Sequence, residues 1–312
     1  YFKSKGGNMP ENNLKQAMLP VGGTVFENNH GTAPGAALEK NGKCVIILPG
    51  PPGELVPMFN ESVRGFLKKY SDGAIVSHTV NIIGMGESSV AEEIEDMFDA
   101  KNPTVAPYAK SGEVRLRITA KAETADDADK MCAPVVDEIC SRLGDVVYGT
   151  DMNSIEERVV ALLKEKGKKI ATAESCTAGY IPKRLTDIPG ASEVFECGIV
   201  SYSNDIKTKL LGVSPKTLET YGAVSEQTAR EMALGAKHVS GADIAISTTG
   251  LAGPGGDGVL PGGLSFAAVT DGERTVVEKI VTGHENDREY NRYVTASRAL
   301  NLARLMLEEK IK

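Results

Sequence analysis

The sequence predicts an α/β protein made of several domains. Its 312 residues are 41% hydrophobic and 25% charged, an ordinary balance for a folded chain, and this length predicts two or three domains. Strand and helix patterns alternate in the second half, which is typical of a layered α/β domain. The early part is instead rich in glycine, proline and asparagine, so we expect its organisation to differ.

Residues 1–72 form the first predicted domain, a partial α/β layer. An apolar run at 44–48 predicts a buried strand of the kind found in parallel sheets, and a helix is expected at 55–70. One strand and one helix are too few for a complete domain. The chain also begins at Tyr1 without an initiator methionine, so we expect a segment upstream of it.

Residues 73–151 predict a small α+β domain. Strands are expected at 77–83, 104–108, 114–120 and 146–148, and helices at 88–98 and 125–143. Apolar and polar residues alternate in the third strand, so one face of the sheet should contact water. The outline resembles an RNA-binding KH domain, but the acidic first helix and the Gly84-Met85-Gly86 turn, which is no G-x-x-G loop, favour a structural spacer.

Residues 152–312 predict a layered α/β domain. Ser154 and Glu157 form a capping box for its first helix, which Gly167 ends. The remaining pattern predicts strands near 170–172, 197–202 and 243–248, helices at 177–185, 225–241 and 287–309, and a hairpin of 264–270 with 274–282.

Two residues at the turn after the first of these strands are candidate nucleophiles, Ser175 and Cys176. Unpaired N–H groups at the start of the expected helix suit an oxyanion, a phosphate or a carboxylate. A thiol at such a position can be acidic, although a free cysteine is more commonly a small buried apolar residue. A serine hydroxyl needs a neighbouring base before it can attack.

Lys207 is the favoured base, because it follows the strand at 197–202 and strand ends at one edge of an α/β sheet form its usual binding crevice. It can accept a proton only if burial lowers its pKa, and the alternative is a solvated lysine at a helix start. A Ser-His-acid triad is disfavoured, because the histidines lie in other domains or at polar surface positions: His30, His78, His238 and His284.

A glycine-rich loop follows the strand at 243–248 and contains Thr249, Gly250 and Gly253. Its N–H groups suit an anion, although such a loop is more often only a turn, and it lacks the Lys-Ser/Thr of a P-loop. Arg288 and Arg292, one turn apart in the last helix, predict either a phosphate contact or a solvated face.

Composition excludes several classes of protein. The net charge of −7 and the pI near 5.3 argue against a surface that follows nucleic-acid phosphates or anionic lipid. The five cysteines form no C-x-x-C pair, so a disulfide framework or a zinc site is not expected. No apolar run is long enough to span a bilayer and no signal-peptide pattern is present, so a reducing, cytoplasmic setting is expected.

Four separated motifs occur in the last region: Ala173-Glu174-Ser175-Cys176-Thr177, Tyr202-Ser203-Asn204 with Lys207, Gly222-Ala223-Val224-Ser225-Glu226, and Thr249-Gly250-Leu251-Ala252-Gly253-Pro254. Together they resemble the C-terminal domain of CinA proteins. Earlier motifs resemble the rest of a full-length CinA, so the resemblance covers nearly the whole chain: Met9-Pro10-Glu11-Asn12-Asn13, 31–35, 48–52 with Glu54, and 103–108.

The resemblance implies that residues 152–312 are a nicotinamide-mononucleotide deamidase, which releases ammonia and nicotinate mononucleotide in pyridine-nucleotide recycling. It implies a Ser175 nucleophile and a Lys207 base, and no metal or cofactor for this reaction. Supporting or oxyanion roles fall on Cys176, Thr177, Tyr202 and Asn204, and substrate binding falls on Glu174, Thr249, Gly250, Gly253 and Arg288. A homodimer that binds a small nucleotide, and neither membrane nor nucleic acid, is expected.

The resemblance also implies that residues 1–72 are the C-terminal part of a MogA-like, molybdopterin-binding-like domain and that 73–151 are KH-like. A metal-dependent ADP-ribose pyrophosphatase activity is attributed to the family's first domain. The family's N-terminal half of that domain is not in this sequence, so this activity, and with it a divalent metal, is not expected. Glu11, Asn13 and Glu54 are the possible remnants of its site, and a non-catalytic competence-related binding protein is the third alternative.

This sequence departs from the family at two positions near the expected deamidase site. Ala178 stands where the family usually has a second glycine, and Leu260 stands where it usually has a lysine. We expect Ala178 to crowd the turn and the loss of the lysine to weaken phosphate binding. Pro182 is compatible with the helix only within its first turn.

Overall fold

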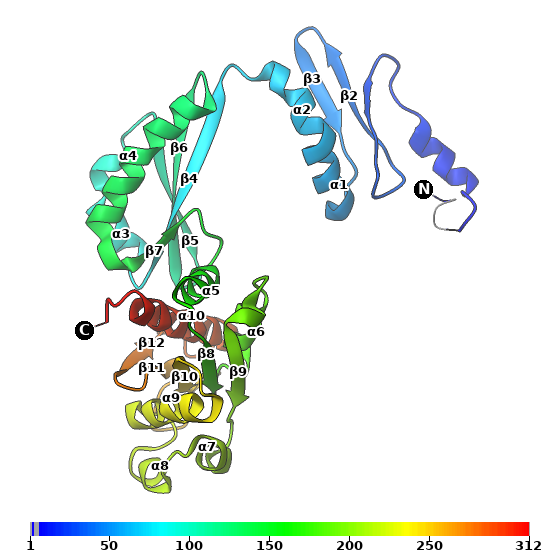
Figure 1. Ribbon diagram of the computed structural model, residues 1–312. Helices are drawn as coiled ribbons and strands as arrows, with labels where there is room; N and C mark the ends of the chain where they lie inside the picture. The colour runs from blue at the N-terminus through cyan, green and yellow to red at the C-terminus, as the bar shows by residue number, and fades with distance from the viewer. Residues whose placement is uncertain (1, 3–5, 312) are drawn as a thin grey trace. The chain divides into compact units, whose positions relative to one another are not determined.

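The computed structural model describes residue 2 and residues 6–311 (Figure 1). It divides into two compact units, Tyr1–Ala74 and Ile75–Lys312, and the middle and last predicted regions both lie in the second unit. The mixed α/β fold predicted from the sequence is confirmed, since each unit combines sheets with helices.

The first unit contains an antiparallel sheet in the order β1-β2-β3, made of Thr24–Phe26, Gly35–Lys40 and Lys43–Ile47. The prediction of a buried parallel strand at 44–48 is therefore wrong. Val45 and Ile47 are 63% and 59% exposed, because alternate residues of β3 point away from the core. An apolar run alone does not reveal which of its residues are covered.

The helix expected at 55–70 is confirmed and starts earlier, at Pro52. Proline suits a first helical position because its missing N–H would have no helical partner there. The helical run passes through α1, a π turn, α2 and a 3-10 turn: Pro52–Met58, Phe59–Val63, Arg64–Leu67 and Lys68–Tyr70. A further 3-10 helix, Glu11–Ala17, was not expected.

The first part of the second unit is the predicted small α+β fold. Its sheet has the order β5-β6-β4-β7, formed by Thr104–Lys110, Glu113–Ala122, Ala74–Ile83 and Val147–Thr150. Helix α4, Ala125–Leu143, has the predicted bounds. Helix α3, Glu87–Glu93, ends before the expected Phe98, because Ile94 leaves the helical conformation and only a 3-10 turn, Glu95–Met97, follows.

The last part of the chain is a sheet covered by helices on both faces. The order is β12-β11-β10-β8-β9, in which β8 (Ile170–Glu174), β9 (Phe195–Val200) and β10 (Ile244–Gly250) are parallel. The hairpin of β11 (Leu264–Thr270) and β12 (Thr275–Val281) is antiparallel, as predicted. The helices are α5 Ile155–Lys166, α6 Tyr180–Thr186, α7 Asn204–Leu211, α8 Pro215–Tyr221, α9 Glu226–Ser240 and α10 Arg288–Leu307.

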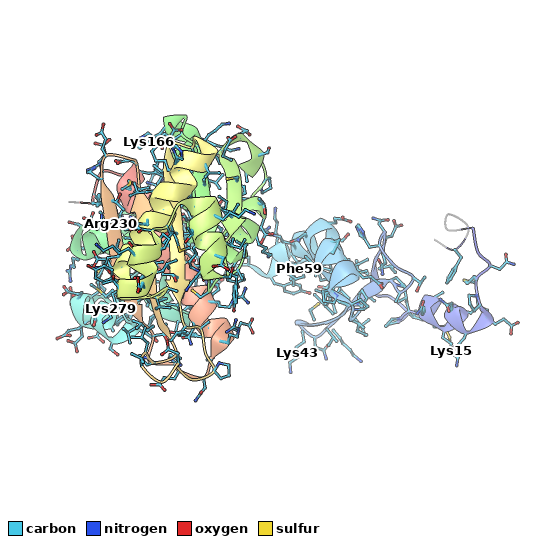
Figure 2. All side chains as sticks on the ribbon, turned by 90° about the horizontal axis from the view of Figure 1, so that it is seen from below. Lys15, Lys43, Phe59, Lys166, Arg230 and Lys279 are labelled. Carbon is cyan, nitrogen blue, oxygen red and sulfur yellow. The ribbon has the colours of Figure 1, made fainter. Side chains whose placement is uncertain are left out.

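Helix α9 packs on one face of this sheet, with α7 and α8 beside it, whereas α5, α6 and α10 pack on the other (Figure 1). Figure 2 labels Arg230 on α9, whose guanidinium donates to the Thr275 carbonyl at 2.8 Å and so ties α9 to β12. The predicted caps are confirmed: Ser154 begins α5, Ser225 begins α9, and Gly167 and Gly241 end them in the left-handed conformation.

Helix α10 also packs against the small α+β fold of the same unit. The Arg304 guanidinium is 0% exposed and donates to the carbonyls of Asp145, at 2.7 Å, and Val147, at 3.3 Å. Glu308, one turn further along α10, accepts from Arg304 at 2.8 Å. Moving α10 away from that fold would leave a buried guanidinium without these partners, which is strongly unfavourable.

We expect Arg304→Met to lower the free energy of unfolding by about 3 kcal/mol, because two backbone carbonyls and the buried Asn301 Oδ1 would lose a charged donor, and Glu308 would lose one of its cationic partners. Urea unfolding followed by circular dichroism measures this loss. The control is Arg274→Met, whose ion pair with Asp271 is solvent-exposed and should contribute no more than about 1 kcal/mol. Equal losses in the two variants would contradict the clamping role of Arg304.

Candidate active site

A cavity of about 340 Å³ opens where β8 and β10 end, the usual place of a binding crevice in a parallel sheet. This volume suits a small molecule. Eight of the residues expected at the site line it: Ser175, Cys176, Tyr202, Lys207, Thr249, Gly250, Gly253 and Arg288. The rest of the lining comes from Ala223, Val224, Leu251, Ala252, Pro254, Gly255 and Gly256.

Ser175 directly follows β8, and its N–H donates to the Thr248 carbonyl at 2.9 Å. The next helix, α6, begins at Tyr180 and not at Thr177 as expected. The reason is the backbone of Ala178 and Gly179, whose φ angles of 50° and 86° are left-handed and incompatible with an α-helix. We call residues 175–179 the nucleophile turn.

The nucleophile turn carries unpaired donors. Within the part of the chain that the structure describes, the N–H groups of Cys176 and Thr177 donate to no oxygen acceptor, and the protein atom that they approach is the Cys176 sulfur. Unpaired N–H groups beside a nucleophilic hydroxyl are the arrangement that stabilises an oxyanion. Because α6 starts later than expected, these donors belong to a turn and not to the first turn of a helix.

Lys207 lies on α7 and is 1% exposed. Its Nζ is 3.0 Å from Ser175 Oγ, 2.8 Å from the Ser201 carbonyl oxygen and 3.3 Å from the Tyr202 carbonyl oxygen. Burial lowers the pKa of this amine. A neutral amine has two N–H groups, which can donate hydrogen bonds to the two carbonyls. Its lone pair then faces the serine hydroxyl.

Cys176 does not compete for the nucleophile's role. Its side chain is buried, and burial raises the pKa of the thiol to about 12. A thiol in that state stays protonated near neutral pH and is a poor nucleophile. Of the two alternatives that the sequence leaves open for Cys176, the structure agrees with a small buried apolar side chain and not with an acidic thiol.

No histidine lines this cavity. His78 is held between Asp129 and Asp151, at 2.8 and 2.6 Å, and its pKa is raised by the hydrogen bond with Asp151. His284 packs its ring against Tyr290. Among the described residues, Lys207 is therefore the base in contact with Ser175 Oγ.

The glycine-rich loop forms another wall of the cavity. Thr249 Oγ1 donates to the Ala223 carbonyl at 2.6 Å, which joins two segments of the lining. Gly253 has a φ of 85°, and a Cβ there would lie 2.3 Å from the Glu285 carbonyl oxygen, so only glycine fits. In the described chain the N–H groups of Ala252, Gly253 and Gly256 have no protein acceptor, which leaves them free for an anion.

Arg288 adds a cation to this wall. Its guanidinium donates to the Gly253 carbonyl at 2.7 Å and to the Tyr202 hydroxyl at 3.5 Å. Leu260 does not line the cavity; its N–H donates to Asp257 Oδ1 at 2.8 Å within the neighbouring turn. Arg288 is thus the positive side chain available beside the free N–H groups.

Three expected site residues do not line the cavity. Glu174 is fully buried on the other face of β8 from Ser175, because strand side chains alternate; there its Oε2 accepts from the Ile181 N–H at 3.2 Å, and burial raises its pKa. The Thr177 side chain is also buried, with its Oγ1 2.6 Å from Thr248 Oγ1. Asn204 is exposed in the first turn of α7.

Arg292 does not line the cavity and is half-buried. Its Nη2 donates to the Thr177 carbonyl at 2.7 Å, so it contacts the backbone of the nucleophile turn. Pro182 lies in the first turn of α6, as it must. The sequence did not predict that the carbonyls of Ser201 and Tyr202 would contact Lys207, although Tyr202 begins a recognised motif and Ser201 precedes it.

The three proposed remnants of an N-terminal site lie in the first unit. Glu11 and Asn13 are in the 3-10 helix Glu11–Ala17, and Glu54 Oε2 accepts from Asn28 Nδ2 at 2.6 Å. Across residues 6–311 no cluster of three histidine, cysteine or acidic side chains is arranged to hold a metal ion. In the same range no helix has the length and apolar character to cross a membrane.

Comparisons with known proteins agree with these motifs. A family model described as the CinA C-terminal domain matches residues 152–307, and one described as the CinA KH domain matches residues 77–149. A competence-damage inducible protein of Clostridium beijerinckii is 53% identical over 92% of this chain and 70% of its own length. A CinA-like protein of Desulfovibrio desulfuricans is 46% identical over 97% of this chain and 72% of its own length.

Two solved structures are also similar. The competence/damage inducible protein of Agrobacterium tumefaciens is 38% identical, with a TM-score of 0.47, over 49% of this chain and 93% of its own. A CinA superfamily protein of Escherichia coli is 32% identical, with a TM-score of 0.46, over 50% of this chain and 92% of its own.

The left-handed Ala178 generates a stability prediction. We expect Ala178→Gly to raise the free energy of unfolding by about 1 kcal/mol, because glycine adopts this conformation without steric cost. The same change at Ala161, an exposed position inside α5, should lower it by about 1 kcal/mol. Urea unfolding of both variants tests the opposite signs, and two losses of equal size would contradict strain at Ala178.

Proposed function

This chain belongs to the CinA family, and we propose that its cavity hydrolyses the carboxamide of nicotinamide mononucleotide to nicotinate mononucleotide and ammonia. The observation that carries this proposal is the buried Lys207 amine 3.0 Å from the Ser175 hydroxyl. A base of lowered pKa in contact with a hydroxyl is the requirement for serine nucleophilic catalysis. Unpaired N–H groups beside that hydroxyl support the same chemistry.

In the first half-reaction Lys207 Nζ accepts the proton of Ser175, and Oγ attacks the carboxamide carbon. The carbonyl electron pair moves to the oxygen, where the N–H groups of Cys176 and Thr177 stabilise the negative charge. The C–N bond then breaks, and the leaving nitrogen takes the proton from Lys207. Ammonia departs and the nicotinoyl group remains as an ester on Ser175.

In the second half-reaction a water molecule gives its proton to the neutral Lys207 and attacks the ester carbon. The same N–H groups stabilise the second oxyanion. When the C–O bond to Ser175 breaks, Oγ takes the proton back from Lys207 and nicotinate mononucleotide is released. In each half-reaction Lys207 Nζ thus accepts one proton and gives one back.

The chemistry of the lining supports a phosphorylated substrate. Lys207 and Arg288 line the cavity, and no carboxylate does. Free N–H groups at Ala252, Gly253 and Gly256 lie along the same wall as Arg288. Backbone donors with an arginine are a common way to bind a phosphate monoester. A nucleoside monophosphate is therefore a better fit than free nicotinamide.

We expect Ser175→Ala and Lys207→Met each to reduce ammonia release from nicotinamide mononucleotide by at least about a thousand-fold, because the two residues act as one unit. The double variant should be no worse than either single one. Lys209→Met is the matched control on an exposed position of α7 and should keep full activity. Activity near the wild-type level in both single variants would contradict the proposal.

The pH dependence follows from the state of Lys207. Only the neutral amine can act as a base, so kcat/KM should rise with pH through the Lys207 pKa and then level off. Burial lowers that pKa, which puts the rise below 10.5, the value for an exposed lysine. A profile of ammonia release against pH tests this, and a rate that falls as the pH rises would exclude lysine as the base.

A further inference from the structure

Arg292 is a cation that the proposed mechanism leaves unused. It lies in the second turn of α10, with its guanidinium carbon 5.6 Å from the centre of the Tyr180 ring. The side chain is half-buried, its Nε is buried without an acceptor, and within the described chain it forms no ion pair with a carboxylate. Withdrawing part of a cation from water without a counter-ion is unfavourable, so the contact that Arg292 does form needs an explanation.

That contact is the hydrogen bond of 2.7 Å from Arg292 Nη2 to the Thr177 carbonyl oxygen. The same oxygen accepts from the Tyr180 N–H at 3.2 Å, which closes the nucleophile turn. The Thr177 carbonyl belongs to the peptide that leads into Ala178, where φ is 50°. Arg292 therefore holds the backbone at the point where it enters the left-handed conformation.

Other contacts also hold the nucleophile turn, beginning with the Ser175 N–H, which donates to the Thr248 carbonyl of β10. The Thr177 hydroxyl contacts Thr248 Oγ1 on β10, and the buried Glu174 accepts from the Ile181 N–H on α6. These contacts tie the turn to β10 through Ser175 and the Thr177 side chain, and they tie the residue before the turn to α6. The Arg292 contact acts on a backbone carbonyl inside the turn, between the two donors of the oxyanion site and the strained residue, and adds a charged side-chain donor to the backbone bond from Tyr180.

We propose that Arg292 is a positioning residue that holds the N–H groups of Cys176 and Thr177 in place for the oxyanion. The inference rests on the proposed serine chemistry and extends it to a residue outside the cavity. Donors that develop their full strength only in the transition state affect kcat and leave substrate binding nearly unchanged. Arg288, which lines the cavity, should instead affect KM.

The experiment compares Arg292→Met with Arg298→Met on the same helix. Arg298 pairs with Glu278 and contacts no residue of the nucleophile turn, so it is a matched control for loss of an arginine from α10. We expect Arg292→Met to lower kcat for nicotinamide mononucleotide about ten- to hundred-fold, with KM changed by less than about threefold. Arg298→Met should leave kcat unchanged.

A second readout does not depend on the substrate. A fluorophosphonate phosphorylates an activated serine: the Ser175 oxygen binds phosphorus, fluoride leaves, and Lys207 takes the proton. The developing charge on the phosphoryl oxygen needs the same N–H donors. Mass spectrometry of the intact protein should show Ser175 labelled about tenfold more slowly in Arg292→Met than in the wild type, and at the wild-type rate in Arg298→Met.

Chemical rescue separates positioning from folding. In Arg292→Ala, added guanidinium ion at millimolar concentration should restore part of the labelling rate, because it can occupy the vacated position beside the Thr177 carbonyl. Unchanged labelling and kcat in Arg292→Met would overturn the proposal, and so would a slow variant that guanidinium does not rescue. Wild-type labelling at Ser175 without ammonia release would overturn the proposed substrate and leave the positioning role intact. An unlabelled wild type would overturn both.

Discussion

The site depends on the burial of one amine. An ammonium at the position of Lys207 would lose several kcal/mol of hydration, and no carboxylate of the described chain is bonded to it in compensation. Hydrogen bonds to two backbone carbonyls and a hydroxyl compensate for only part of the lost hydration free energy, so the neutral amine is favoured over the ammonium. Each unit of pKa depression corresponds to about 1.4 kcal/mol between the two forms. The protein thus gives up stability at the position where the proposed reaction needs a base.

The nucleophile turn also contains a conformation that costs stability. A left-handed alanine costs about 1–2 kcal/mol, and Ala178 is held in that conformation beside the nucleophile. A hydrogen bond from a charged donor is worth about 1.5–3 kcal/mol, so the Arg292 contact is large enough to offset the strain. Glycine at position 178 would remove the strain, and with it part of the need for a strong external donor.

The sequence predicted much of the last region, because its signals are local. Ser225 and Gly241 bound α9, and the Asp271-Gly272 turn joins β11 to β12. The pairing of Ser175 with Lys207 was predictable as well, because both follow parallel strands whose ends share one edge of the sheet.

What the sequence could not predict depends on tertiary contacts. The late start of α6 follows from the φ angles of Ala178 and Gly179, and alanine gives no signal of that conformation. The face of β8 on which Glu174 lies depends on the register of the strand. The exposure of Val45 likewise depends on whether anything covers that face of β3. The contact of Arg292 joins residues 115 positions apart in the chain.

Helix α10 connects these parts physically. Arg288 lines the cavity, Arg292 holds the nucleophile turn, and the hydroxyl of Tyr293 donates to the buried Glu113 of β6 at 3.3 Å. Near its other end Arg304 donates to the carbonyls of Asp145, just before β7, and of Val147, the first residue of β7. A rotation of α10 large enough to withdraw Arg292 from Thr177 would break the contacts with the small α+β fold as well. The contacts of α10 with the small α+β fold therefore connect that fold to the helix that carries Arg288 and Arg292.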